Sequence, residues 1–345
     1  MARICIYGAG AIGCYLGGRL LAGGADVTFV GRMPLGEELQ RHGLSLSDYR
    51  GGHWRLEPAA IAFATGPTAA ASAALVLVTV KSAGTEAAAA ELAPVLSPNA
   101  VVLSLQNGIG NARLLQAALP RQRVLAGMVP FNVVKSSPGA FHQGSAGHLH
   151  TEASPALEPF LARFADAGLA LVRHLDMEPV LWAKLLLNLN NAINALSGLP
   201  LREELAQHAY RQCLALAQEE ALALLEKSGI RPARLTPVPA RWLPAVLRLP
   251  DALFRRLARR MLAIDPLARS SMADDLAAGR ITEIDWLNGE VERLAAQLGH
   301  GAPVNARLTE LVRAAERSDD HRSWPGDALL AELQKAAAGP AGAPS

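Results

Sequence analysis

Apolar residues in the first half of the chain follow two alternating patterns. Short apolar runs typical of buried strands are separated by longer stretches with the 3.6-residue period of helices. The strand-like runs are Ile4–Tyr7, Val27–Val30, Leu75–Val80, Val101–Leu105 and Val124–Met128. The helix-like stretches are Ile12–Leu21, Glu86–Leu96 and Asn111–Leu119. Such alternation predicts a largely parallel sheet with helices packed against it.

Other segments complete this pattern and then replace it. Leu44–Leu46 and Trp54–Leu56 are expected to form a hairpin, and Phe141–Thr151 and Leu169–Val172 further strands. From Glu178 onward the period is helical, over 178–196, 203–228, 240–262, 272–278, 283–298 and 303–317. We therefore predict an α/β fold with two domains and a tail. A Rossmann-type domain spans 1–176, an all-helical domain spans 177–335, and 336–345 is a disordered, low-complexity tail. The cleft between two such domains is the default place for an active site.

A glycine-rich motif follows the first expected strand directly. It reads Gly8-Ala9-Gly10-Ala11-Ile12-Gly13, which is G-x-G-x-x-G between a strand and a helix. In this context the first glycine permits a tight turn, the second lets backbone approach a pyrophosphate, and the third lets the helix pack closely on the strand. The following helix N-terminus then faces the phosphates with unpaired N–H groups. The motif predicts dinucleotide binding.

The residue after the second strand indicates which dinucleotide is bound. An NAD site carries an Asp or Glu near the end of this strand, whereas the strand here ends Val30-Gly31-Arg32. A guanidinium pairs with a 2′-phosphate, which a carboxylate would repel. Arg32 therefore favours NADPH as cofactor; the alternative is a solvated surface arginine.

Three polar residues recur on one face of the Leu-rich helix expected at 178–196. Lys184, Asn188 and Asn191 are spaced i, i+4 and i+7 and so share that face. An ammonium and two amides are costly to bury without partners, so the stripe predicts an active site. A solvent-facing stripe is the alternative.

Further candidates lie in loops and at a helix start. Lys81 and Asn107 follow two of the expected parallel strands, whose carboxyl ends face the ligand crevice in open sheets. Ser271 and Glu283 belong to two later polar clusters, and Glu283 is expected in the first turn of a helix capped by Thr282. Simpler interpretations remain for both groups: loop polar residues, and a carboxylate that complements the helix dipole.

Composition and charge narrow the class of protein. Hydrophobic residues make up 50% of the chain, charged residues 19%, and the net charge is +2, which gives no indication of nucleic acid or an anionic membrane as a partner. The three cysteines are widely spaced, as in a reducing cytoplasm, and form no metal motif. We expect a cytoplasmic protein with a small-molecule ligand, no metal and no membrane span. Abundant apolar helix surface in the second domain is compatible with a homodimer.

Four motifs in order resemble those of the ketopantoate reductases (2-dehydropantoate 2-reductases). They are Gly8–Gly13, Gln106–Gly110, Leu181–Leu185, and Ser270–Met272 together with Glu283–Gly289. The resemblance extends to about residue 317. It implies NADPH as hydride donor, a 2-keto acid as acceptor, and a Rossmann domain followed by a helical domain like that of 6-phosphogluconate dehydrogenases.

The resemblance also implies individual roles, position by position. Arg32 meets the 2′-phosphate, Lys81 and Asn107 line the nicotinamide side, and Lys184 is the proton donor. Asn188 contacts the substrate hydroxyl, Ser271 contacts its carboxylate, and Glu283 lies near the ribose and the lysine.

Two departures from the family pattern concern the substrate. Ala192 stands where the family commonly has a further Asn, for which Asn191 or Asn194 can substitute, and Arg231–Pro266 is longer and richer in proline. The expected activity is reduction of ketopantoate to pantoate in pantothenate synthesis. Reduction of another branched 2-keto acid is the first alternative, and a non-catalytic NADP sensor is the second.

Overall fold

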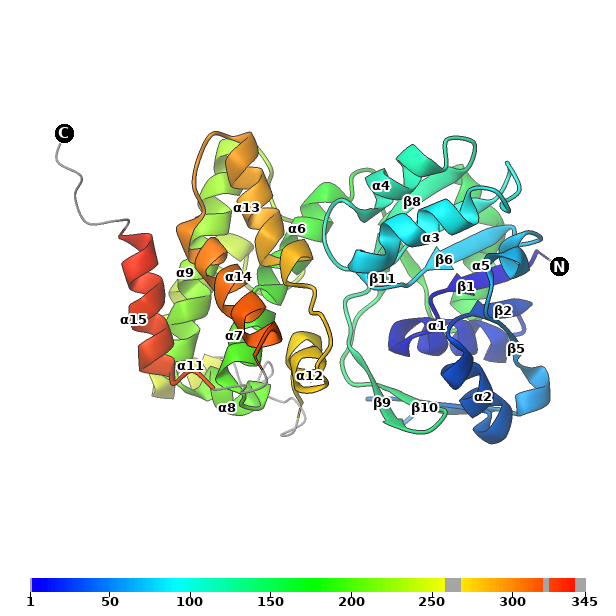
Figure 1. Ribbon diagram of the computed structural model, residues 1–345, viewed down its shortest axis with the longest axis horizontal. Coiled ribbons are helices and arrows are strands. Elements are labelled where there is room, and N and C mark those ends of the chain that lie inside the picture. Colours follow the sequence, from blue (N-terminus) through cyan, green and yellow to red (C-terminus); the bar gives the residue numbers. More distant parts are fainter. Residues whose placement is uncertain (1, 258–267, 319–322, 339–345) are drawn as a thin grey trace. The chain divides into compact units, whose positions relative to one another are not determined.

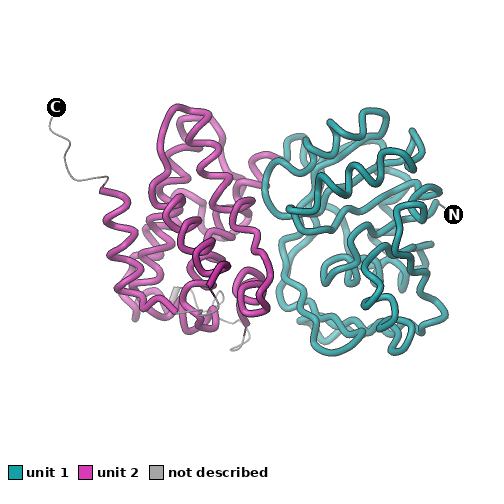
Figure 2. Tube along the Cα trace, in the orientation of Figure 1, with its two compact units in different colours: residues 1–177 teal, residues 178–345 magenta. Residues whose placement is uncertain are grey.

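The computed structural model describes residues 2–257, 268–318 and 323–338 (Figure 1). The chain divides into two compact units, residues 1–177 and residues 178–345 (Figure 2). The first unit contains the strands, and the second is helical, so the α/β fold class expected from the sequence is confirmed.

The main sheet of the first unit is largely parallel. Within the described residues it has eight strands in the order β12-β11-β8-β7-β6-β1-β2-β5, and the pair β11–β8 is antiparallel. The bounds are β1 (Ile4–Tyr7), β2 (Val27–Val30), β5 (Ala62–Ala64), β6 (Leu75–Val78), β7 (Val101–Ser104), β8 (Arg123–Met128), β11 (Leu149–Glu152) and β12 (Leu171–His174). Strands β1, β6 and β7 are buried along their whole length, which explains why they are apolar apart from Ser104 at the end of β7.

Helices cover both faces of this sheet. Side chains alternate along β1, so Ile4 and Ile6 join one core cluster while Cys5 and Tyr7 join another. The first cluster takes in helices α1 (Ala11–Ala22) and α5 (Glu158–Asp166), and the second takes in α3 (Thr85–Leu92) and α4 (Asn111–Ala118). Helix α2 (Met33–His42) follows β2 directly. Helices α2 and α5 were not expected from the sequence.

A second, smaller sheet has the order β4-β3-β10-β9. Its strands are β3 (Leu44–Asp48), β4 (His53–Leu56), β9 (Val133–Ser137) and β10 (Ala140–Gln143). The antiparallel pair β3–β4 confirms the expected hairpin. The expectation of a strand running through Phe141–Thr151 is wrong, because β10 and β11 belong to different sheets. The connection passes through Gly147, whose positive φ of 151° suits glycine and interrupts an extended strand.

The helical unit contains more and shorter helices than the hydrophobic period indicates. The bounds are α6 (Glu178–Asn188), α7 (Asn190–Ser197), α8 (Leu201–Ala206), α9 (His208–Lys227), α10 (Leu243–Leu247), α11 (Asp251–Leu257), α12 (Ser271–Ala277), α13 (Asn288–Gln297), α14 (Pro303–Glu316) and α15 (Gly326–Ala337). The helices expected at 178–196, 203–228 and 240–262 are each divided, and 258–262 lie outside the described residues. Apolar spacing continues across each break, which is why the breaks are not visible in the sequence.

Helix α15 corrects the expected start of the tail. Residues 336 and 337, assigned to the disordered tail, are the last residues of this helix. Leu329 and Leu333 are fully buried and anchor it, and the helix contacts α9. Alanine is the best helix former, so the Ala-rich sequence continues the helix once those leucines are packed.

A buried arginine ties the segment before α11 to helix α9. The guanidinium of Arg211 is fully buried and donates to the carbonyl oxygens of Leu205, Leu247 and Leu249 at 2.9–3.0 Å. It also pairs with Asp251 at 2.7 Å and lies over the ring of Phe254. The proline-rich region that departs from the family pattern is therefore fixed on α9 at this point.

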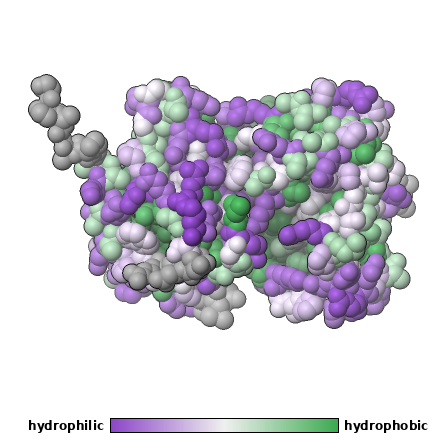
Figure 3. Space-filling model, viewed as in Figure 1, coloured by the Kyte–Doolittle hydropathy of each residue, from purple (hydrophilic) through white to green (hydrophobic). Residues whose placement is uncertain are grey.

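Polar and apolar residues are interspersed over the face drawn in Figure 3. In the described ranges, every helix is too short or too polar to cross a lipid bilayer.

Candidate active site

The glycine loop between β1 and α1 leaves one position bare of contacts. A Cβ added to Gly8 would lie 2.5 Å from the amide nitrogen of Val80, and one added to Gly13 would lie 2.6 Å from the oxygen of Gly8. Both glycines are therefore required by close packing. Around Gly10, by contrast, the nearest described atom to an added Cβ is 3.9 Å away. Packing within the described structure does not explain Gly10, whereas the approach of a pyrophosphate does.

The backbone of this loop shows which amides can face a phosphate. The N–H groups of Gly8 and Ala9 both donate to the oxygen of Val30, and Gly10 donates to the oxygen of Gly8. Ala11, Ile12 and Gly13 form the first turn of α1, where helix geometry provides no acceptor for an N–H group. Gly10 is the N-cap and offers no capping side chain. The loop therefore fits the phosphates of a dinucleotide.

Arg32 is exposed at the N-cap of α2, immediately beyond β2. No carboxylate occupies the end of β2, since Val30 and Gly31 precede the arginine. Arg32 makes no ion pair within the described part of the chain. Its charge is thus available to an anionic ligand.

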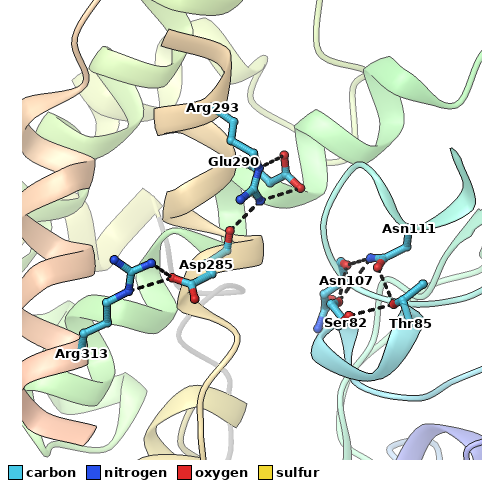
Figure 4. Close-up of polar contacts among 8 residues, drawn as sticks. All are labelled: Ser82, Thr85, Asn107, Asn111, Asp285, Glu290, Arg293 and Arg313. Atoms are coloured by element: carbon cyan, nitrogen blue, oxygen red, sulfur yellow. Dashed lines mark hydrogen bonds and ion pairs between the residues drawn. The ribbon is translucent and has the colours of Figure 1, made fainter. Parts of the chain in front are cut away.

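Lys81 and Asn107 lie just beyond neighbouring parallel strands. Strands β6 and β7 pair in register from Leu75 with Val101 to Val78 with Ser104, which places the two following loops at the same edge of the sheet. Lys81 is exposed and Asn107 is partly buried. A cluster of buried polar side chains lies behind them, and Figure 4 shows Ser82, Thr85 and Asn111 from that cluster around Asn107. Sequence reasoning missed these three residues.

Lys184 and Asn188 lie on helix α6, and Asn191 lies in the first turn of α7. The expectation of one uninterrupted helix is wrong, because α6 ends at Asn188. Lys184 is partly buried, and desolvation lowers the pKa of its ammonium to about 8. A lysine with a lowered pKa gives up its proton more readily near neutral pH, which suits a general acid.

The structure distinguishes the two asparagines that could replace the family residue at Ala192. Asn194 is fully buried, and its amide donates to Leu199 O at 2.9 Å and to Glu204 Oε2 at 2.8 Å. Its Oδ1 accepts from the N–H of Ser270 at 2.8 Å. Asn194 is therefore occupied in holding other elements, while Asn191 stays partly exposed.

Ser271 is the first residue of α12 and is exposed. Ser270 caps this helix, because its Oγ accepts from the N–H of Ala273 at 3.1 Å. The same hydroxyl faces the carbonyl of Asn191 at 3.3 Å. Ser271 and Asn191 are thus held near each other within the helical unit.

Glu283 lies in a loop rather than in the first turn of a long helix. A short 3-10 turn follows it at Ile284–Trp286, and α13 begins only at Asn288. The interpretation of Glu283 as a first-turn carboxylate of helix 283–298 is therefore wrong. Thr282 does cap locally, since its Oγ1 accepts from the N–H of Ile284 at 3.2 Å.

The loop around Glu283 is attached to helices on both sides. The N–H of Thr282 donates to Glu316 on α14 at 2.7 Å. Asp285 pairs with Arg313 at 2.6 Å, and its carbonyl accepts from Arg293 (Figure 4). The carboxyl group of Glu283 is thus carried by a fixed segment. Within the described residues there is no group of three or more His, Cys, Asp or Glu arranged to hold a metal ion.

Comparisons with known proteins agree across both units. The family model "Ketopantoate reductase PanE/ApbA" matches residues 4–155, and its C-terminal counterpart matches residues 176–316. A 2-dehydropantoate 2-reductase of Halobacterium salinarum is 30% identical over 332 residues, which cover 91% of this chain and 99% of that protein.

Solved structures share the fold. A PanE/ApbA family ketopantoate reductase from Ralstonia eutropha JMP134 matches with a TM-score of 0.78 and 32% identity, over 91% of this chain and 98% of that one. A D-mandelate dehydrogenase determined with NADH and anilino(oxo)acetate matches with a TM-score of 0.75 and 20% identity, over 91% and 98%. At that lower identity the likeness concerns the fold alone.

Proposed function

We propose that this chain, which belongs to the ketopantoate reductase family, reduces 2-dehydropantoate to pantoate with NADPH, a step of pantothenate synthesis. Family membership makes it an oxidoreductase of the 2-dehydropantoate 2-reductase type with a nicotinamide cofactor. The observation that carries the finer proposal is Lys184. Its ammonium lies on an otherwise Leu-rich helix, and burial brings its pKa to about 8.

The glycine loop and Arg32 would hold the cofactor. The first-turn amides of α1 receive the pyrophosphate, and Gly10 leaves room for it. Arg32 pairs with the 2′-phosphate, which supports NADPH over NADH. Lys81 and Asn107 would line the nicotinamide, and Glu283 would lie near its ribose. When bound, the nicotinamide supplies a hydride to the keto carbon.

The remaining residues act on the keto acid. Lys184 donates a hydrogen bond to the carbonyl oxygen, stabilises the negative charge that develops there, and transfers its proton to that oxygen. Lysine is left neutral and regains a proton from solvent. Asn107, Asn188 and Asn191 orient the substrate, and Ser271 binds its carboxylate. Glu283 keeps the lysine ammonium in position.

NADPH oxidation with ketopantoate tests the proposal, using Lys184→Ala as the variant. General acid catalysis contributes about 10²–10⁴-fold, so kcat should fall by that factor. Lys335→Ala removes an exposed lysine of α15 and serves as the matched control. Near-normal turnover of Lys184→Ala would contradict the role of Lys184. Tight NADPH binding without turnover of any keto acid would favour the sensor.

Cofactor preference is tested separately with Arg32→Ala. Loss of a hydrogen-bonded charge pair costs about 1.5–3 kcal/mol, so the ratio of NADPH to NADH efficiency should fall about 10- to 100-fold. Arg41→Ala, an exposed arginine on the same helix, is the control. An unchanged ratio in Arg32→Ala would refute the 2′-phosphate role.

A second candidate is reduction of another branched 2-keto acid. It is favoured by Ala192, which is fully buried where the family commonly has an Asn, and by the longer proline-rich segment from Arg231. A panel of 2-keto acids compared by kcat/KM decides between the two substrates. A higher kcat/KM for any acid other than ketopantoate would select the second candidate.

A further inference from the structure

A buried polar network lies in the first unit beneath Lys81 and Asn107. Its five side chains come from two neighbouring strand-to-helix connections, and each exposes less than a tenth of its surface. They are Ser82, Thr85, Ser104, Gln106 and Asn111. Burying this many polar groups is costly unless each finds a partner, so their arrangement calls for an explanation.

The hydrogen bonds of the network converge on the backbone of one loop residue. The carbonyl oxygen of Asn107 accepts from Ser82 Oγ at 2.8 Å and from Asn111 Nδ2 at 2.5 Å (Figure 4). Two donors on one carbonyl fix the orientation of that peptide plane. The direction in which the Asn107 side chain leaves the backbone is thereby restrained.

Thr85 links the hydrogen bonds on the Asn107 carbonyl to residues at the end of β7. Its hydroxyl accepts from Gln106 Nε2 at 2.6 Å, and it faces two acceptors, Asn111 Oδ1 at 2.7 Å and the carbonyl oxygen of Ser82 at 2.8 Å. Gln106 in turn accepts from Ser104 Oγ at 3.0 Å. The Thr85 hydroxyl thus sets the amide of Asn111 so that its NH₂ group points at Asn107. Removal of the hydroxyl would leave three buried polar groups with fewer partners.

We propose that Asn111 and Thr85 are positioning residues for the reduction, acting through the backbone of Asn107. Neither touches substrate or cofactor; Asn111 holds the carbonyl of Asn107, and Thr85 orients Asn111. The proposal rests on the proposed function, in which Asn107 lines the nicotinamide and the keto acid. A buried network that served only to join α3 to α4 would not need to converge on that carbonyl.

A pair of variants at Thr85 separates shape from hydrogen bonding. Thr85→Val keeps the shape and removes the hydroxyl, while Thr85→Ser keeps the hydroxyl. Misplacement of a catalytic group by about 1 Å can cost about 100-fold. We expect Thr85→Val and Asn111→Ala to lower kcat/KM for ketopantoate about tenfold or more, and Thr85→Ser to restore most of it. The Kd of NADPH, followed by its fluorescence, should change less than about threefold, because the glycine loop and Arg32 are untouched.

A double-mutant cycle tests whether the effect passes through Asn107. In an Asn107→Ala background, Asn111→Ala should change kcat/KM by less than about twofold, because its target side chain is gone. The control is Gln116→Ala on the same helix α4, whose side chain bonds Leu119 O, Gln122 O and Val124 N. It should lower the unfolding midpoint without lowering kcat/KM.

Any of five results would overturn the proposal. Wild-type kcat/KM in both Thr85→Val and Asn111→Ala would overturn it. Losses that multiply in the Asn107→Ala/Asn111→Ala double variant would overturn it as well. An equal loss in Gln116→Ala would show that general destabilisation is the cause. If Asn107→Ala lowers kcat/KM but Asn111→Ala does not, the positioning role is refuted and the role of Asn107 in the proposed function stands. Unimpaired Asn107→Ala removes the assignment of Asn107 in the proposed function, and the positioning role with it.

Discussion

Replacement of Glu204 by Gln should stabilise the protein, and more so at higher pH. Glu204 on α8 is fully buried, and its Oε2 accepts from the amides of Asn194 and Asn190 at 2.8 and 3.3 Å. Its Oε1 has no hydrogen-bond partner in the described structure. Burial raises the pKa of this carboxyl group from 4.5 to about 8, so it carries a proton at neutral pH.

The size of the effect follows from this difference in pKa. Below pH 4.5 the carboxyl is protonated in both the folded and the unfolded chain, so its ionisation does not lower folding stability. As pH rises from 4.5 to 8, the unfolded chain releases the proton while the folded chain retains it, so folding stability falls. At about 1.36 kcal/mol per pH unit, the loss reaches about 5 kcal/mol above pH 8. Glutamine keeps an oxygen acceptor for both asparagines and does not ionise.

Urea unfolding of the wild type and Glu204→Gln from pH 5 to pH 9 measures this directly. The stability difference should be below about 1 kcal/mol at pH 5 and grow to several kcal/mol at pH 9. Glu203→Gln, at the exposed neighbouring position, should follow the wild-type curve. Parallel pH curves for the wild type and Glu204→Gln would refute the reasoning, because they would mean that Glu204 titrates alike in both states.

Other predictions concern the cofactor loop, the proton donor and the helical scaffold. The rate of reduction should fall as pH rises through about 8, where Lys184 loses its proton; a flat kcat profile from about pH 7 to 9.5 would contradict this. Gly10→Val should keep wild-type thermal stability and weaken NADPH binding tenfold or more. Gly13→Ala should lower the melting temperature, because its added Cβ would lie only 2.6 Å from the oxygen of Gly8. Arg211→Met should lower the free energy of unfolding in urea by about 3 kcal/mol, because buried carbonyl oxygens lose their hydrogen-bond donor. Arg202→Met, at an exposed position, should change it hardly at all.

The sheet was predictable because its central strands obey a simple rule. Strands buried within the sheet are mostly apolar, and β1 and β2, in which only Thr28 is partly buried, have the bounds that the sequence indicates. The helical unit follows a weaker rule. A break such as Leu189 costs little when the apolar spacing continues on both sides, and Leu189 keeps helical dihedral angles of −57° and −23°. Helix boundaries there depend on tertiary contacts that no local pattern records.

Some residues of the candidate site could likewise be predicted from the sequence, and others could not. The Lys184 stripe was visible because charged and amide side chains are conspicuous on a Leu-rich helix. The choice between Asn191 and Asn194 was not visible, because it depends on the contact of Asn194 with Ser270, which is 76 residues away in the chain. Thr85 and Asn111 were missed for the same reason, since each is a single polar position whose partners belong to other elements.

The contacts of Arg211 bear on how freely the sequence of the proline-rich segment can change. In the segment, Leu247 and Leu249 offer main-chain oxygens to Arg211, which every amino acid carries, so these two hydrogen bonds do not depend on the side chains at those positions. Mutations at Leu247 or Leu249 leave those oxygens in place. Side chains at Leu247 and Leu249 can therefore change without loss of these hydrogen bonds, whereas Asp251 is held through its side chain. A region anchored in this way can accumulate sequence differences between relatives while its backbone attachment to the helical scaffold stays the same.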